Sequence, residues 1–192
     1  LAYSDKYLGY ISVTDTIKED TAEGLKALKD IGVTDLVMLT GDNRETAEVV
    51  AEQTGITEVH ANLLPEDKVA IAEQILDKGR IAAFVGDGVN DAPVLARVDA
   101  GIAMGGLGSA AAMEAADVVI MDDNPKKISL AIRIGRKTVR LAKENIWFAL
   151  IVKLLVLVLG ALGLVNMWAA VFADVGVAVI AIANSMRALR VK

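Results

Sequence analysis

The sequence predicts an α/β fold with a mostly parallel sheet, followed by an α-helical hairpin that spans a membrane. Over residues 1–125, short apolar runs alternate with helical patterns, which is typical of βαβ units. After residue 145, two apolar segments are each long enough to cross a bilayer. The mean hydropathy of the 192-residue chain is +0.47, which is high for a small soluble domain and agrees with a membrane segment.

Each element of the α/β part follows from a local pattern. The apolar run at 81–85 is continuous, so we expect a strand covered on both faces. Helices are expected where apolar residues recur at helical spacing, as at Val69, Ala72 and Leu76. The expected strands lie at 7–13, 36–39, 58–60, 81–85, 100–103 and 118–120. The expected helices lie at 18–28, 45–53, 66–76 and 90–96.

Composition excludes several kinds of site and partner. The chain has no cysteine and a single histidine, His60, so disulfides, thiolate metal sites and histidine clusters are excluded within it. Before Lys126 it carries 23 acidic and 9 basic residues, a net charge of −14. From Lys126 onward it carries 2 acidic and 11 basic residues, a net charge of +9. These basic residues bracket apolar sequence, so we expect a membrane and no nucleic acid as partner.

Residues 126–145 are expected to form a basic amphipathic helix between the domain at 1–125 and the apolar segments. Four basic residues recur on one face at helical spacing, opposite an apolar face. They are Arg133, Arg136, Lys137 and Arg140. A solvated helix face would also explain this pattern, but the apolar sequence that follows favours a helix at the cytoplasmic membrane surface.

Residues 146–192 are expected to hold two transmembrane helices, at 146–165 and 167–183, and a basic tail. Each apolar segment contains one charged residue and matches the hydrocarbon thickness of a bilayer. Basic residues flank both outer ends, so the positive-inside rule places both ends in the cytoplasm. Two core helices of a soluble protein are the alternative, but a domain of this size would struggle to bury them all round. The chain begins with Leu1 and lacks a signal-peptide pattern, so we expect a piece of a longer integral membrane protein.

Two polar loops follow the clearest buried strands. Thr40, Gly41 and Asp42 follow one strand, and the segment 86–91 follows another. Ligands of α/β sheets bind at the carboxyl ends of the strands, so both loops lie where a site is expected. Thr40 can donate a hydrogen bond to a phosphate oxygen, and glycines let the backbone approach a ligand closely. Lys68, near a helix start, can offset phosphoryl charge.

The second loop adds candidate metal ligands. Asp87 and Asp91 offer the hard oxygen ligands that Mg²⁺ prefers. A lone Thr-Gly-Asp would mostly be a turn with a helix cap, and a lone lysine would mostly be solvated surface. The three motifs together, in this order and at these positions, indicate a phosphate site.

These motifs resemble a known family. Thr40-Gly41-Asp42-Asn43, Lys68 and Gly86-Asp87-Gly88-Val89-Asn90-Asp91 look like the phosphorylation domain of P-type ATPases, within the haloacid-dehalogenase-like superfamily. Asp15-Thr16-Ile17-Lys18 resembles the family's hinge segment. The resemblance covers essentially the whole chain, because a membrane hairpin follows this domain in the pumps. It implies a Rossmann-type parallel sheet and the C-terminal part of an ATPase.

The resemblance also implies roles for these residues. Thr40 and Lys68 would bind the aspartyl-phosphate, and Thr40, Gly41, Asp42 and Lys68 would line the cofactor site. Asp87 would be a Mg²⁺ ligand, Asn90 would contact the phosphoryl group, and Asp91 would support the ion or the lysine. The phosphorylated aspartate of the family lies in an Asp-Lys-Thr-Gly-Thr motif, which this chain lacks. The part that grips ATP is also missing, so we expect this polypeptide alone not to hydrolyse ATP.

The two charges within the apolar segments suggest what is transported. Lys153 and Asp174 lie about 11 Å and 15 Å deep from the cytoplasmic side, so they can meet across the hairpin. The functional interpretation makes Asp174 a transient ligand of a metal cation and Lys153 its built-in counter-ion. The alternatives are a purely structural pair and a Lys153 side chain that extends to the membrane interface. The pattern is similar to heavy-metal P-type ATPases that export Zn²⁺, Cd²⁺ or Pb²⁺ across a bacterial-type plasma membrane. The copper pattern of that family is not met.

Two rival functions remain open at this point. A membrane-anchored phosphatase of the same superfamily would need a nucleophilic aspartate in an Asp-x-Asp loop, which the chain lacks. A non-enzymatic membrane module would keep the fold without using the phosphate loops. Substitutions at Asp87 and Asp174 separate these hypotheses from the pump.

Overall fold

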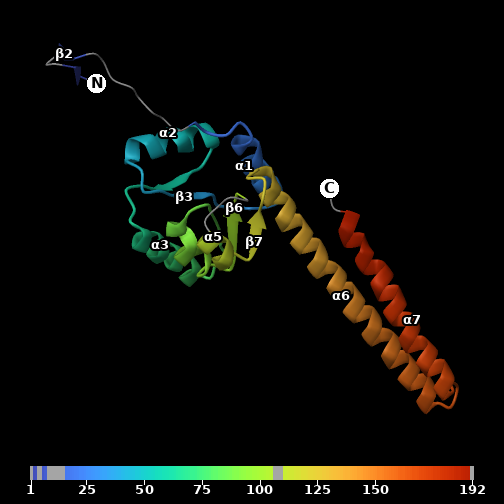
Figure 1. The fold of residues 1–192 in the computed structure, drawn as a ribbon. Coiled ribbons are helices and arrows are strands. Elements are labelled where there is room, and N and C mark those ends of the chain that lie inside the picture. The colour runs from blue at the N-terminus through green and yellow to red at the C-terminus, as the bar shows by residue number, and fades with distance from the viewer. Residues whose placement is uncertain (1, 4–5, 8–15, 106–109, 191–192) are drawn as a thin grey trace.

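The protein consists of an α/β part and a long helical hairpin that projects from it (Figure 1). The structure is a computed structural model that describes residues 2–3, 6–7, 16–105 and 110–190. Most of the expected strand at 7–13 and Asp15 of the expected hinge lie outside the described residues.

Five strands of the α/β part pair in parallel, as expected, but in two groups. The strands β3 (Val37–Leu39) and β4 (Glu58–His60) form one pair, with Met38 opposite Val59. The strands β5 (Ala83–Gly86), β6 (Ala100–Met104) and β7 (Val118–Ile120) form the other group in that order. Among the described residues, β3 and β5 each have a hydrogen-bonded neighbour on one edge only. A short antiparallel pair, β1 (Ala2–Tyr3) and β2 (Lys6–Tyr7), precedes them.

The helices that connect the strands begin and end where the sequence places caps. Asn43 accepts a hydrogen bond from the Thr46 amide at 2.8 Å, and Gly55 ends the same helix in the left-handed region at φ 73°. The helices of the α/β part are α1 (Thr21–Asp30), α2 (Arg44–Thr54), α3 (Pro65–Asp77), α4 (Ala92–Leu95) and α5 (Ala110–Ala115). A short 3₁₀ turn, η1 (Val89–Asp91), precedes α4, and α5 was not expected from the sequence.

The core lies between the three-stranded group, α1 and the beginning of the hairpin. Its buried side chains come from α1, β6, β7 and the first helix of the hairpin. They are Leu28, Ile102, Met104, Ile120 and Ile128. Ile128 is the first apolar residue of the helix that leaves the domain, so burial of its side chain attaches the hairpin to the α/β part.

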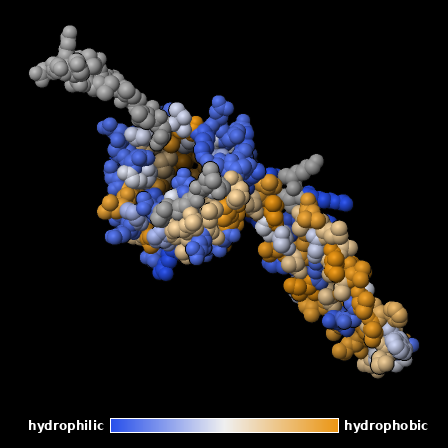
Figure 2. All heavy atoms as spheres, in the orientation of Figure 1, coloured by the Kyte–Doolittle hydropathy of each residue, from blue (hydrophilic) through white to orange (hydrophobic). Residues whose placement is uncertain are grey.

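The hairpin consists of α6 (Lys126–Ala161) and α7 (Met167–Ser185), followed by the 3₁₀ turn η2 (Met186–Arg190). Both helices are long and apolar enough to cross a membrane, with an 18-residue window of mean hydropathy 1.9 in α6 and 1.8 in the second helix. These windows are almost entirely exposed, and apolar side chains cover most of the visible hairpin surface (Figure 2). Asn166 begins α7 by accepting a hydrogen bond from the Ala169 amide at 2.9 Å.

Two expectations differ from the structure. The strand expected at 81–85 begins at Ala83, and the Ile81 side chain is 93 % exposed, so the run is not covered on both faces within this chain. Ala83 and Val85, which alternate along β5, are exposed as well, so one face of the strand is left uncovered by the described residues. The expected division at residue 145 is absent, because 126–145 and 146–161 form the single uninterrupted helix α6. No proline interrupts α6, and Gly135 alone is too weak a helix breaker to end it.

Candidate phosphate site and hairpin ion pair

The first loop of the candidate phosphate site is a tight turn after β3. The Thr40 hydroxyl donates to Asp42 Oδ2 at 2.9 Å and accepts from the Asp42 amide at 3.0 Å. A Cβ at Gly41 would lie 3.3 Å from the Leu63 carbonyl oxygen, so glycine suits this close approach. Thr40 and Asp42 are therefore held together, and the Thr40 hydroxyl would donate to a phosphate oxygen only after it turns away from Asp42.

This turn is bound to the segment that starts α3. The Leu63 amide donates to the Thr40 carbonyl at 3.0 Å, and the Asn62 amide donates to the Asp42 carbonyl at 2.8 Å. Asn62 has φ 57°, in the left-handed region that asparagine tolerates. Asp67 then caps α3 by accepting from the Leu64 amide at 2.9 Å. The chain after β4 therefore carries Lys68, in the first turn of α3, toward the ends of the strands.

The second loop, after β5, meets Lys68. Lys68 Nζ lies 2.8 Å from Asp91 Oδ1, and only 16 % and 12 % of the two side chains are exposed. Gly86 makes room for this pair, because a Cβ there would lie 2.8 Å from Asp91 Cβ and 2.9 Å from Asp91 Oδ2. The structure thus brings together Lys68 and Asp91, two residues that the sequence analysis placed 23 positions apart in one site.

The residues of this loop can hold a divalent cation through one carboxylate. Asp87 is exposed, whereas Asp91 is engaged with Lys68. Mg²⁺ binds proteins through one or two carboxylates and completes its shell with water and phosphate oxygens. Among the described residues no group of three or more His, Cys, Asp or Glu side chains could hold a metal alone. The Asp87 carboxylate together with the oxygens of a substrate phosphate is therefore a set of ligands that fits Mg²⁺. Asn90 lies exposed in the same loop.

The second charged pair lies in the hairpin. Lys153 Nζ of α6 and Asp174 Oδ1 of α7 are 3.1 Å apart. The side chains are 63 % and 64 % exposed, because nothing but the partner helix covers them. Their depths along the helices predicted this contact, and the structure contains it.

A polar network that the sequence analysis missed joins the same two helices nearer the α/β part. Asn145 of α6 donates to Ser185 Oγ at 2.9 Å and to the Ala181 carbonyl at 3.2 Å. Asn184 donates to Asn145 Oδ1 at 2.9 Å. The signal was present in the sequence as two asparagines at the outer ends of the apolar segments, near the basic residues. Such side-chain bonds fix the register of neighbouring membrane helices.

Comparison with known proteins identifies the α/β part. A family model of haloacid dehalogenase-like hydrolases matches residues 1–99. The chain belongs to this family. The parallel strands and the position of the polar loops at their carboxyl ends agree with this assignment.

Relatives of this haloacid dehalogenase-like chain are metal-transporting ATPases. It is 53 % identical over its whole length to a cadmium, zinc and cobalt-transporting ATPase of Bacillus subtilis, and covers 28 % of that protein. It is 53 % identical over 97 % of its length to a zinc-transporting ATPase of Synechocystis, and covers 26 % of it. The chain therefore spans about a quarter of the length of these relatives. The resemblance to heavy-metal P-type ATPases is confirmed, and the phosphatase alternative is not favoured.

A solved structure shows the same arrangement of α/β part and hairpin. The crystal structure of a zinc-transporting PIB-type ATPase in the E2·Pi state aligns with 97 % of this chain. The aligned part makes up 30 % of the ATPase chain in that structure. The TM-score is 0.87 and the sequence identity 37 %. The fold expectation, a haloacid-dehalogenase-like parallel sheet followed by a membrane-type helical hairpin, is thus confirmed.

Ion pairs fasten the beginning of α6 to this haloacid dehalogenase-like domain. The carboxylates of Asp20 and Glu23 both contact the Lys126 ammonium, and this hydrogen bonding raises the pKa of Lys126. Lys127 donates a hydrogen bond to Asp122 and lowers the pKa of that carboxyl. Arg136 donates to the Ile31 carbonyl at the end of α1. The first three turns of α6 are therefore attached to α1 and to the loop after β7.

Proposed function

We propose that this chain is the C-terminal part of an ATP-driven P-type pump that exports Zn²⁺, Cd²⁺ or Pb²⁺ through an aspartyl-phosphate intermediate. The observation that carries the proposal is the Lys153–Asp174 pair in the apolar hairpin. The first helix of this hairpin begins in the core of the α/β part, which carries the candidate phosphate site. A phosphatase needs no charge within its membrane helices. A pump needs both the phosphate site and a cation ligand at membrane depth.

In this proposal the α/β part neutralises and positions a phosphoryl group. Lys68 places its ammonium beside the transferred oxygens, and Asp91 holds that ammonium in place through the 2.8 Å contact. Thr40 donates to a phosphoryl oxygen from the turn that Gly41 and Asp42 complete, and Asn90 contacts the same group. Phosphoryl transfer depends mainly on such positioning and charge neutralisation.

The phosphorylated aspartate comes from the rest of the pump. The open edges of β3 and β5 suit a further parallel strand, which would bring an aspartate at its carboxyl end between the Thr40 turn and the Asp87 loop. Such a strand would also cover the exposed side of β5. The part of the pump that binds ATP likewise lies outside this chain.

Asp87 is the residue that would hold Mg²⁺. The bound ion would supply neutralisation of the phosphate charge during transfer. Asp87 offers an exposed carboxylate for it, and Lys68 keeps Asp91 away from that role.

In the hairpin, Asp174 binds the transported ion and Lys153 takes its place when the ion leaves. A carboxylate oxygen is an ordinary ligand of Zn²⁺. The Lys153 ammonium lies 3.1 Å from Asp174 Oδ1, where a bound cation would lie. Metal binding must therefore displace the ammonium, and metal release lets it return to Asp174. We place both ends of the hairpin on the cytoplasmic side of a plasma membrane, because basic residues flank them and few lie between.

The experiment compares two carboxylate substitutions in the complete pump. Asp174→Asn keeps the size of the side chain and removes its charge, so metal-stimulated ATP hydrolysis should fall by about 100-fold or more. Glu144→Gln is the matched control, because Glu144 is the other acidic residue after Lys126 and pairs with Arg187 outside the apolar segment. Hydrolysis should persist in the control. Full metal-stimulated activity of Asp174→Asn would contradict the ligand role.

A second variant tests the phosphate site separately. Lys68→Met should lower the rate of phosphoenzyme formation from ATP by about 100-fold or more, whereas metal binding to the hairpin stays unchanged. Phosphoenzyme formation at the normal rate in Lys68→Met would contradict the assignment of the site.

A further inference from the structure

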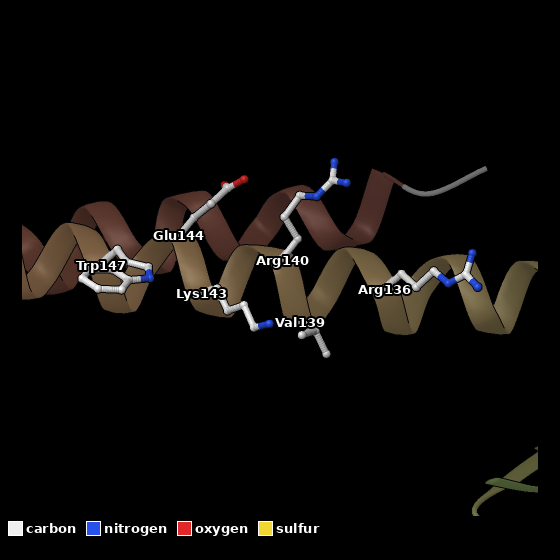
Figure 3. A pocket seen from close by; sticks show the side chains of 6 residues that line it. All are labelled: Arg136, Val139, Arg140, Lys143, Glu144 and Trp147. Carbon is white, nitrogen blue, oxygen red and sulfur yellow. The ribbon is translucent and has the colours of Figure 1, made fainter. Parts of the chain in front are cut away.

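A cluster of basic side chains lies on α6 immediately before its apolar part. Arg136, Val139, Arg140, Lys143, Glu144 and Trp147 line a shallow hollow along about three turns of the helix. Figure 3 shows them in sequence along α6, with Trp147 at the apolar end and Arg136 at the end toward the α/β part. We infer that this hollow binds anionic glycerophospholipids through their phosphate headgroups, with Arg140 and Lys143, which extend to different sides of α6, as the cations that contact them.

Lys143 lies at the depth of the headgroup layer, and Arg140 lies just beyond it, within reach of its long side chain. Lys143 and Arg140 precede Ile146, the first residue of the apolar segment, by about 4.5 Å and 9 Å along the helix axis. The headgroup layer of each leaflet is about 5–8 Å thick. Lysine and arginine side chains extend toward such an interface while their aliphatic stems stay on the helix.

The charges of these two residues are free for a ligand. Arg136 already donates to the Ile31 carbonyl, and Glu144 lies 3.6 Å from Arg187. Among the residues that the structure describes, no acidic side chain forms an ion pair with Arg140 or Lys143. Because Glu144 is itself paired with Arg187, the hollow keeps a net positive charge that suits a phosphodiester anion.

Trp147 supplies the apolar side of the hollow. Its side chain is exposed at the boundary between the basic and apolar parts of α6, where an indole ring prefers to lie in a membrane. A ligand with both a phosphate and acyl chains satisfies the cations and the ring together. Free phosphate would satisfy only the cations, so the combination favours a lipid.

The test measures which lipid lies next to Trp147 when the complete 192-residue chain is in vesicles. Bromine atoms on the acyl chains quench tryptophan fluorescence at close range, so dibrominated phosphatidylglycerol and dibrominated phosphatidylcholine are compared at equal mole fraction. Trp168→Phe leaves Trp147 as the single reporter. Each cation contributes about fivefold in lipid affinity, so we expect phosphatidylglycerol to be preferred by about fivefold to 25-fold.

Paired charge substitutions make the test specific to this hollow. Arg140→Gln with Lys143→Gln should bring the preference to about one. Arg133→Gln with Lys137→Gln removes the same charge from the same helix but about 13–20 Å from Ile146, beyond the headgroup layer, and should leave the preference within about twofold. Equal quenching by the two lipids in the parent chain, or an equal loss in both double variants, would overturn the inference. So would competition by millimolar inorganic phosphate, which would indicate a site for the free anion.

The inference rests on the membrane placement of the hairpin in the proposed function, and the same data separate the two. In Trp147→Phe, Trp168 near the other end of the hairpin is the reporter. Quenching of both tryptophans without a lipid preference refutes the headgroup site and leaves the membrane placement intact. Absence of quenching at both tryptophans refutes the membrane placement, and the headgroup site with it.

Discussion

Two lysine–aspartate pairs, Lys68–Asp91 in the α/β part and Lys153–Asp174 in the hairpin, differ in their surroundings. Lys68 and Asp91 are 2.8 Å apart and 16 % and 12 % exposed. Lys153 and Asp174 are 3.1 Å apart and 63 % and 64 % exposed. The first pair is enclosed by its own domain, whereas the second is covered by a single neighbouring helix.

This difference indicates what each pair can do. An enclosed ion pair resists separation, because a buried charge without its partner is costly. Lys68 is therefore a fixed positive charge, and in the proposed function this charge faces the phosphoryl group. In the proposed function, Asp174 exchanges Lys153 for a transported cation, so this pair must separate in each cycle.

The largest expected effect breaks the enclosed pair. Asp91→Ala leaves the Lys68 ammonium shielded and unpaired, so it should lower the free energy of unfolding of the α/β part by about 3 kcal/mol. Adding Lys68→Met removes the orphaned charge and should restore most of that loss. Urea denaturation of the chain, followed by circular dichroism, measures both. If Asp91→Ala unfolds at the parental urea concentration, the pair is not enclosed as described.

The next effect compares a glycine in each region. A Cβ at Gly101 in β6 would lie 2.4 Å from the Leu95 carbonyl oxygen, which is backbone and has little room to move. Gly101→Ala should therefore lower the free energy of unfolding by about 1–3 kcal/mol. At Gly135 in α6 no heavy atom lies within 4 Å, so Gly135→Ala should stabilise the helix by about 0.5–1 kcal/mol. Thermal unfolding measures both changes in stability. If Gly101→Ala raised the stability as Gly135→Ala is expected to do, the close packing at β6 would be contradicted.

A double-mutant cycle on the hairpin sharpens the comparison of the two pairs. Lys153→Met and Asp174→Asn, singly and together, should show a coupling free energy of about 0.6–1.7 kcal/mol in lipid nanodiscs. This is smaller than the coupling expected between Lys68 and Asp91, because polar side chains of membrane helices find other partners when a pair is broken. A larger coupling in the hairpin than in the α/β part would reverse the interpretation of which pair is fixed.

The smallest effect concerns the junction between the two regions. The hydrogen bond from Lys127 lowers the pKa of Asp122 from its ordinary value of 3.8. A carboxyl whose pKa is lowered by folding stabilises the folded state above its unfolded pKa, and this stabilisation is lost as the pH falls through the folded pKa. Lys127→Ala should move the Asp122 pKa back toward 3.8, as measured by NMR titration of the carboxyl carbon. An unchanged pKa would show that Lys127 is not the cause.

Much of the site follows from local sequence. Asn43 caps the start of α2, and Pro65 and Asp67 mark the start of α3. Both helix starts depend only on residues within a few positions of each other. The helix and strand boundaries near Thr40, Lys68 and Asp87 were therefore predictable to within two or three residues. The contact of Lys153 with Asp174 was predictable too, because a short link and a regular helical rise determine which residues face each other.

Contacts between distant segments were not predictable in the same way. The sequence left Asp91 as a ligand of the ion or a support of the lysine, and the fold places it against Lys68. The Asn145–Asn184 contact was missed, because an asparagine near the end of an apolar segment has no periodic partner in the sequence. The sequence analysis also did not predict that β3–β4 and β5–β7 form separate groups. No short sequence pattern determines which distant strands pair.

By itself, the sequence determined the order of strands and helices, the polar loops at the strand ends, and the two apolar helices with one charge each. These properties depend on hydrophobic period, caps and turns over a few residues, which act along the chain. Only the tertiary structure decided that α6 continues without a break from the domain core into the hairpin, that β5 is left with an open edge, and that Asp91 faces Lys68. These properties depend on which surfaces meet, and packing between segments that are far apart in the chain settles them.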